Sequence, residues 1–306
     1  MEDEKNPVAT KEQAETKTPT ATLSSSPRHN AGGAFYSIVR WFRRKVTPVL
    51  YGGCSEKDFV DAARKNEWKF VINQYRSHHV DLDSADPTDG STALICSARN
   101  GSTSLVCFLV ENGCDVDICD REGRSALLWA CRNKYSKIAK HLITQGGANV
   151  DLEDAQGLTA LLCLCRNTRL TRAEGEIALL IAERSTNVNA AQKKDGLAAL
   201  HFACRFGHGA ALVDAILKGG ADASLCDNEG FRPLHWACRG NNLAAARQLL
   251  YHAPKLDMNA RARDGRTSAE LAAIYGTIEF TRYLLMKGAS IPVEPPFKGE
   301  ESEMVL

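Results

Sequence analysis

Hydrophobic and polar residues follow one pattern six times over between residues 86 and 291. Each copy opens with a glycine and a short, mostly apolar segment such as "GRSALLWACRNK", and a second apolar segment such as "LVCFLVENGCDVD" follows it. The glycines are spaced by 33, 34, 39, 34 and 35 residues, at Gly90, Gly123, Gly157, Gly196, Gly230 and Gly265. Apolar residues three and four positions apart form one face of a helix. The pattern therefore predicts a pair of short helices in every copy.

Turn and cap residues stand where these helices should begin and end. The opening glycine suits a turn with positive φ, and Thr92, Ser125, Thr159 and Thr267, each two residues on, can cap the first helix. Left-handed glycines are predicted to end the second helix. They are Gly113, Gly147, Gly220 and Gly288.

The copies resemble the ankyrin repeat, whose signature T-P-L-H-x-A is nearest in Arg232-Pro233-Leu234-His235-Trp236-Ala237. This resemblance implies an all-α solenoid, in which helix-turn-helix pairs are joined by β-hairpin-like loops. One copy cannot bury its own apolar face, so neighbours must stack. The ankyrin-repeat domain is expected over residues 51–291. It includes a degenerate N-terminal capping unit before Gly90 and a last copy that should present a polar face.

Two copies depart from the common spacing. The third carries about four extra residues around 168–176, which predicts a surface loop between its helices. It also has Ser185-Thr186 where a glycine usually ends the second helix, and the fifth copy has Ala253-Pro254 there. Both joints are expected to be weak points in the stack.

Helical geometry separates the residues of each first helix into two faces. The fourth, seventh and eighth residues after the glycine form the packed stripe, and the sixth lies opposite. In ankyrin-repeat proteins, which the chain resembles, that opposite face lines the concave surface that binds partners. We expect a partner groove at the large aromatic residues of this sixth position, because such residues dominate binding energy. They are Trp129, Phe202 and Trp236. The alternative is that they pack against the preceding hairpin or a neighbouring helix.

The ninth position is occupied by arginine in five copies and by Ile274 in the sixth, and Arg64 is the counterpart in the capping unit. Such a ladder could bind an acidic or phosphorylated segment through charge-assisted contacts. Alternatively, the arginines pair with the hairpin carboxylates Asp89, Glu122, Asp154, Asp195 and Glu229. The five are Arg99, Arg132, Arg166, Arg205 and Arg239.

The sequence contains no catalytic or metal-binding pattern. The eleven cysteines are spread out and form no paired C-x-x-C clusters, which favours reduced thiols over a zinc site. His201 and His235 belong to the repeat pattern, where a structural role is expected. The chain has no phosphate-binding loop, nucleophile elbow or H-E-x-x-H helix. We therefore expect no enzyme activity, no metal and no cofactor.

The segments outside the array carry separate expectations. Residues 1–33 should be a disordered tail, and 292–306 a flexible acidic one. Residues 34–50 should contain an amphipathic basic helix over 34–46, which either docks on the capping unit or binds an anionic membrane. The membrane hypothesis names its apolar and basic residues. They are Phe35, Arg40, Trp41, Phe42, Arg43, Arg44 and Lys45.

Charge and hydropathy bound the setting. The net charge of +1 gives no reason to expect nucleic acid as a partner, and no apolar run is long enough to span a membrane. We expect a cytoplasmic monomer that binds a protein partner as an adaptor or scaffold. The alternatives are a membrane-peripheral scaffold, a regulatory subunit and a nuclear cofactor.

Overall fold

A computed structural model describes residues 56–78 and 80–291, and the predicted basic helix over 34–46 and both predicted tails lie outside these residues. The described part contains fourteen helices in seven consecutive pairs. The first helices are α2 (Glu56–Arg64), α4 (Ala93–Asn100), α6 (Ala126–Arg132), α8 (Ala160–Cys165), α10 (Ala199–Phe206), α12 (Pro233–Arg239) and α14 (Ser268–Tyr275). The second helices are α3 (Trp68–His78), α5 (Thr103–Glu111), α7 (Ser136–Thr144), α9 (Arg172–Arg184), α11 (Ala210–Lys218), α13 (Leu243–His252) and α15 (Ile278–Met286).

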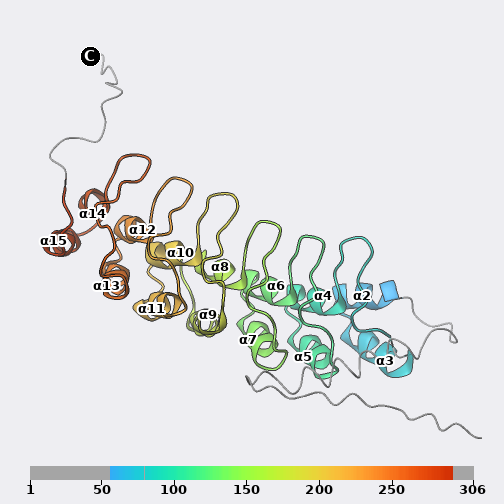
Figure 1. The fold of residues 1–306 in the computed structure, drawn as a ribbon. Helices are drawn as coiled ribbons and strands as arrows, with labels where there is room; N and C mark the ends of the chain where they lie inside the picture. The colour runs from blue at the N-terminus through green and yellow to red at the C-terminus, as the bar shows by residue number, and fades with distance from the viewer. Residues whose placement is uncertain (1–55, 79, 292–306) are drawn as a thin grey trace, which may run out of the picture. The chain divides into compact units, whose positions relative to one another are not determined.

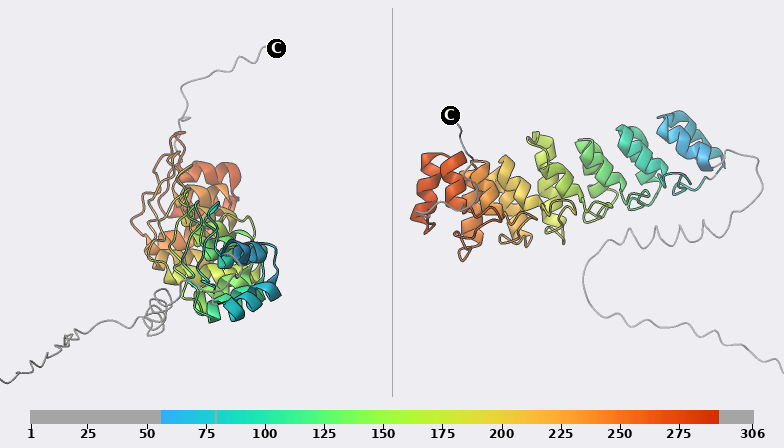
Figure 2. Two further views of the ribbon diagram at one scale, coloured as in Figure 1. Left: turned by 90° about the vertical axis from the view of Figure 1, so that its right-hand side faces the viewer. Right: turned by 90° about the horizontal axis from the view of Figure 1, so that it is seen from above.

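The pairs stack side by side in two rows. Each first helix packs on the first helices before and after it, and the second helices form a parallel row from α5 to α13 (Figure 1). The loops between pairs lie on the side of the first helices, away from the second helices (Figure 2). The predicted in-phase helix pairs are therefore confirmed. None of the helices described has the length and apolar composition required to cross a bilayer.

The predicted turn and cap residues act as expected. The six repeat glycines all have φ between 73° and 79°. At Gly157 an added Cβ would also come within 2.8 Å of the Ala191 carbonyl in the next loop, so a larger residue is excluded by space as well as by conformation. Thr92, Ser125 and Thr267 accept a hydrogen bond from the backbone three residues on, which satisfies a free N–H of each helix.

Two first helices begin without a Ser or Thr cap, and histidine replaces it. In α10 the Nδ1 of His201 accepts the N–H of Ala198 at 3.0 Å, and in α12 the Nδ1 of His235 accepts the N–H of Arg232 at 3.0 Å. The opposite nitrogen, Nε2, then donates to the carbonyl of Leu225 or Ala260 in the following loop. Both histidines thus join one copy to the next, which confirms their structural role.

The third copy is longer because its second helix is longer. The extra residues form a short connection after Cys165 and then the first turn of α9, so the expectation of a surface loop over 168–176 is wrong for residues 172–176. A capping box stabilises this start. The N–H of Thr171 donates to Glu174 Oε2 at 2.7 Å, and the N–H of Glu174 donates to Thr171 Oγ1 at 3.3 Å.

The joint after α9 is tied down, contrary to expectation. Asp151 of the preceding loop accepts hydrogen bonds from the hydroxyl of Ser185 and from the N–H and hydroxyl of Thr186, at 2.5 to 2.8 Å. A carboxylate with three donors therefore replaces the missing glycine.

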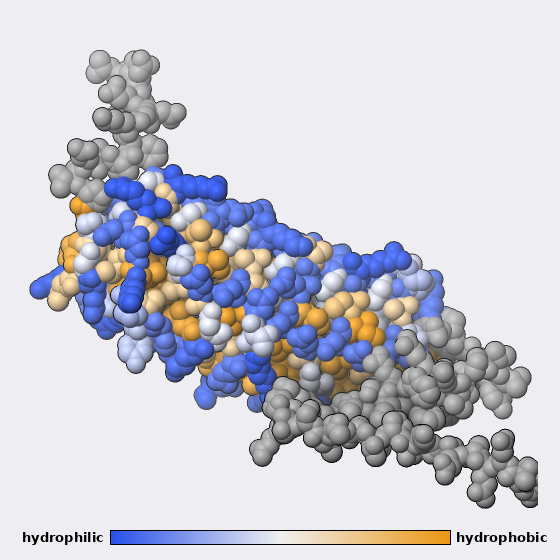
Figure 3. Space-filling model, in the orientation of Figure 1, coloured by the Kyte–Doolittle hydropathy of each residue, from blue (hydrophilic) through white to orange (hydrophobic). Residues whose placement is uncertain are grey.

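The last copy presents a mixed face where a polar one was expected, because apolar side chains are exposed beside Glu279, Arg282 and Lys287. On α14 and α15, Ile274, Ile278 and Met286 are exposed, Ile278 by 89% and Met286 by 77%. Hydrophobic surface is visible at this end of the array (Figure 3). Phe280 and Leu284 are fully buried, so α15 is covered on one side and exposed on the other.

Candidate functional site

In each copy, the sixth residue after the repeat glycine is buried or only partly exposed. Trp236 and Phe202 are each only 8% exposed, and Cys96, Cys163 and Leu271 are buried as well. The expectation of an open aromatic row on this face is therefore wrong for Trp236 and Phe202, and Trp129 is only partly exposed. Helical geometry correctly turned these residues away from the packed stripe. It could not show that the loop covers that side.

A buried carboxylate in the loop fixes each indole ring. Trp236 Nε1–H donates to Asp227 Oδ2 at 2.9 Å, and Trp129 Nε1–H donates to Asp120 Oδ2 at 3.0 Å. The other oxygen of Asp227 accepts the backbone N–H groups of Glu229 and Phe231. Each tryptophan is thus fixed at its edge, because a buried donor and a buried acid satisfy one another.

Four of the five arginines of the ninth position lie over these two rings, and Arg166 lies over none in the described chain. Arg205 and Arg239 stand 4.8 and 5.3 Å from the centre of the Trp236 ring, and Arg99 and Arg132 stand 5.5 and 5.6 Å from that of Trp129. Each ring is therefore flanked by the arginine of its own copy and that of the copy before, at distances where cation–π attraction operates. We call this set the arginine row. It consists of Arg99, Arg132, Arg166, Arg205 and Arg239.

Cysteine takes the place of the ring in the third copy. Burial raises the pKa of Cys163 to about 11, and Asp154 raises it too, while Arg166 and Arg132 lower it. Asp154 corresponds to Asp120 and Asp227, but no indole is present to bind it. Its Oδ2 is buried without a hydrogen-bond partner among the described residues.

Carboxylates neutralise only the beginning of the ladder. Arg64 pairs with Asp86, Asp61 and Asp89 at 2.7 to 3.2 Å, and Arg99 lies 4.0 Å from Asp89. The side chains of the other four arginines make no ion pair or hydrogen bond to any residue that the structure describes. The alternative in which hairpin carboxylates neutralise the ladder therefore applies only at Arg64 and Arg99. The four are Arg132, Arg166, Arg205 and Arg239.

Burial and like charge act together at the C-terminal half of the arginine row. Burial lowers the pKa of Arg205, and the nearby charge of Arg239 lowers it further. Arg205 nevertheless stays protonated at physiological pH, because arginine starts from so high a pKa. Two cations are thus held over one ring, and a bound anion would relieve their repulsion.

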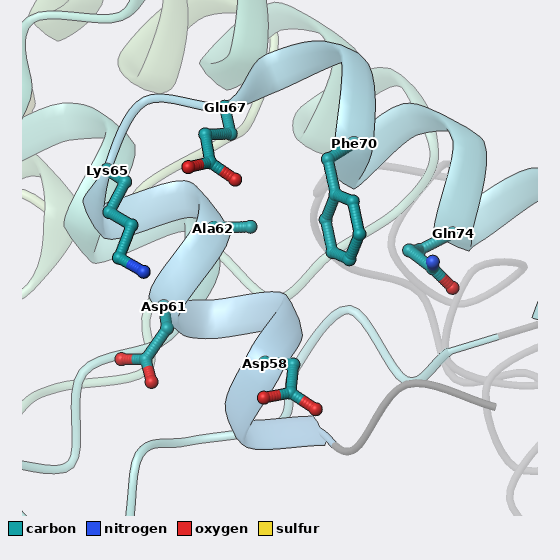
Figure 4. Close-up of a pocket in the computed structure, with 7 residues that line it drawn as sticks. All are labelled: Asp58, Asp61, Ala62, Lys65, Glu67, Phe70 and Gln74. Carbon is teal, nitrogen blue, oxygen red and sulfur yellow. The ribbon is translucent and has the colours of Figure 1, made fainter.

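A shallow pocket lies between α2 and α3, at the other end of the array. Its volume is about 380 Å³, and Figure 4 shows Asp58, Asp61 and Glu67 beside Lys65 and Phe70. Three carboxylates and one ammonium group line this pocket, and Asp61 also pairs with Arg64, so its charge is opposite in sign to that of the arginine row.

Comparisons with known proteins agree with the geometry. The family model described as "Ankyrin repeats (3 copies)" matches residues 59–154 and 200–294. The unmatched stretch between them includes the longer third copy. An ankyrin-repeat domain from Acinetobacter baumannii AYE has a TM-score of 0.55 at 26% identity, over 65% of this chain and 99% of that one. The ankyrin-repeat domain of Bcl-3 has a TM-score of 0.56 at 20% identity, over 77% and 100%, which shows the fold alone.

Longer proteins share the same repeats. The E3 ubiquitin-protein ligase KEG of Arabidopsis thaliana is 33% identical over 117 residues, which cover 38% of this chain and 7% of KEG. The putative palmitoyltransferase ZDHHC13 of Danio rerio is 28% identical over 211 residues, 68% of this chain and 26% of that protein. This chain thus spans only a small part of either relative, and the likeness lies in the array. The chain belongs to the ankyrin-repeat family.

Proposed function

We propose that the array is a protein-binding module that holds an acidic segment of its partner along the arginine row. Ankyrin repeats generally mediate protein–protein interaction, and their domains are typically modules without catalytic activity. One observation carries the finer proposal. Four arginines in successive copies present guanidinium groups that no acid of the described chain neutralises, at Arg132, Arg166, Arg205 and Arg239.

Stacking prepares these side chains for binding. An arginine held over an aromatic ring loses less conformational freedom on binding, and its planar fork matches a carboxylate with two parallel hydrogen bonds. Trp129, Phe206 and Trp236 then contribute by orienting the arginines that lie over them, and direct contact with the partner falls to the guanidinium groups.

The spacing of the copies restricts the partner. Neighbouring helices pack about 8–10 Å apart, and an extended chain advances about 3.3 Å per residue. An extended segment that follows the arginine row would therefore meet it with about every third residue. A segment with acidic residues at that interval fits best.

Binding of a labelled acidic peptide tests the proposal. The probe is a short peptide with glutamate at every third position, measured by fluorescence anisotropy against the full chain. We expect the variant Arg132→Gln/Arg166→Gln/Arg205→Gln to bind at least about tenfold more weakly, because each lost contact contributes about 0.5–1.5 kcal/mol. Added salt should weaken binding to the unaltered chain.

The chain offers a matched control on the second helices. Lys137, Lys140 and Arg282 are exposed there, and Lys137→Gln/Lys140→Gln/Arg282→Gln removes the same charge. This control should bind the peptide within about twofold of the unaltered chain, because net charge alone acts weakly at a distance. An equal loss in both variants would show a general effect of charge and overturn the proposal.

A further inference from the structure

The fourth copy differs from its neighbours in the charge beneath the arginine row. Four copies place a buried aspartate at the loop position that faces the sixth residue, at Asp86, Asp120, Asp154 and Asp227. The fourth copy has Gln192 there, which is buried and uncharged. Its Nε2 has no hydrogen-bond partner among the residues described. This copy therefore lacks the buried negative charge that those four copies have at this loop position.

Nearby residues make the same region more positive. Lys193 and Lys194 follow Gln192 in the loop and are exposed. On the helices, Arg205 lies 5.1 Å from the centre of the Phe206 ring and 4.8 Å from that of Trp236. Arg239 shares the Trp236 ring, and neither arginine pairs with an acid that the structure describes. Two unpaired guanidinium groups therefore share one ring, and the loop of the fourth copy carries two exposed ammonium groups.

The acids of this region are engaged elsewhere or lie outside contact distance. Asp227 Oδ2 accepts the Trp236 indole, and its Oδ1 accepts two backbone N–H groups. Asp195 accepts the N–H of Leu197. Glu229 is exposed and makes no ion pair within the described chain. No acid that the structure describes therefore forms an ion pair with Arg205 or Arg239, although Asp227 keeps its charge beneath the Trp236 ring.

We propose that Arg205 and Arg239, which share the Trp236 ring, form a subsite for a phosphorylated serine or threonine of the partner segment. This inference rests on the proposed function and assigns one place on the arginine row to a dianion. A phosphate carries about −1.5 to −2 charges and three acceptor oxygens, so it can bind both guanidinium groups at once. A carboxylate carries one charge and neutralises only one of them.

The other half of the arginine row provides an internal comparison. Arg99 and Arg132 flank Trp129 at similar distances, but Arg99 lies near Asp89 and the ring also carries Arg124, which Asp120 and Glu122 neutralise. The same stacking geometry thus occurs with extra acids beside it. A preference for phosphate should appear at Trp236 and not at Trp129.

Three versions of the acidic peptide test the subsite, with serine, glutamate or phosphoserine at the central position. We expect phosphoserine to bind about tenfold more tightly than glutamate near pH 7.5, and this advantage to shrink below pH about 6, where phosphate becomes a monoanion. Arg205→Lys/Arg239→Lys keeps the charge but loses the forked geometry. It should reduce the advantage to less than about threefold and leave the glutamate peptide within about threefold.

Two further variants complete the design. Gln192→Glu supplies the acid that the fourth copy, which carries Arg205, lacks in its loop, and it should also reduce the phosphoserine advantage. Arg99→Lys/Arg132→Lys should leave the advantage unchanged. Circular dichroism melting checks that every variant folds. If Gln192→Glu does not fold, Arg205→Lys/Arg239→Lys still tests the subsite, because it keeps both positive charges.

The outcomes separate this inference from the proposed function. If glutamate and phosphoserine peptides bind equally while the arginine-row variants still weaken both, the subsite is refuted and the acidic groove stands. If neither peptide binds, both fail. Equal effects of the two lysine double variants also overturn the subsite. The subsite is also overturned if the chain binds vesicles that contain a phosphoinositide but does not prefer the phosphoserine peptide. That result would assign the site to a lipid headgroup.

Discussion

Asp120, Asp154 and Asp227 occupy the same place in three copies, but only Asp120 and Asp227 have an indole to bind. This difference makes a matched pair of substitutions informative. Asp227→Asn turns an acceptor into a donor opposite the Trp236 N–H and should cost about 1.5–3 kcal/mol in the free energy of unfolding. Asp154→Asn removes a buried charge that has no partner on Oδ2 and should cost less than about 1 kcal/mol. Urea titration measures both, and equal costs would contradict the indole contact.

His201 and His235 predict how stability depends on pH. Burial lowers the pKa of both imidazoles below the ordinary value, although hydrogen bonds oppose this in part. The unfolded chain, with a histidine pKa near 6.5, therefore binds protons first as pH falls. Stability should be complete above pH about 7 and should decline as pH drops through 6.5 towards the lower folded pKa.

Urea midpoints on both sides of this range test the statement. His201→Gln/His235→Gln should be less stable than the unaltered chain at neutral pH, because the two bridges between copies are weakened. Its stability should also change less with pH. An equally steep decline in the double variant would assign the pH dependence to other groups.

At the scale of single elements, α9 tests whether the extra residues of the third copy are ordered. Thr171→Ala removes the hydroxyl half of the capping box and should destabilise the array by about 1 kcal/mol. Thr144→Ala, at the exposed end of α7, is the control and should have almost no effect. Unfolding midpoints that do not distinguish the two variants would indicate that α9 begins later than Thr171.

Local signals in the sequence were sufficient to predict the helices and their caps. Gly90, Thr92 and Gly113 mark one copy completely, and each acts as its residue type allows. The start of α9 was missed because Thr171 and Glu174 form a capping box inside what looked like an insertion. The T-x-x-E pattern there is a readable signal of a helix start.

The candidate site was less predictable, because it depends on contacts between copies. The arginines could be found from their position in each copy. Their lack of acidic partners could not, since Arg64 and Arg239 look alike in the sequence while only Arg64 meets Asp86 and Asp89. The burial of Trp236 was also hidden, because the loop that covers it folds back over its own helix.

At the scale of the whole array, buried thiols report on local unfolding. Four cysteines of the first helices recur from copy to copy and are buried, and burial raises the pKa of each, that of Cys165 to about 12. Cys226 is exposed and should react first with a thiol reagent. Stability in a solenoid is roughly a sum over neighbours, so the uncovered last copy should open most readily. The four buried cysteines are Cys131, Cys165, Cys204 and Cys238.

We therefore expect Cys238, next to the last copy, to react faster than Cys131 and Cys165. Mass spectrometry of the labelled peptides over time gives the order. Identical rates for all buried thiols would mean that the array opens as one unit.

The central claim is that the arginine row is the binding surface. The most direct measurement records the Nε–H signals of the arginines by NMR while the glutamate peptide is added, with each signal assigned by substitution. The signals of Arg132, Arg166, Arg205 and Arg239 should shift together and saturate, while that of Arg172, exposed on a second helix, should not move. Shifts confined to Arg172 and other arginines outside the arginine row would contradict the account.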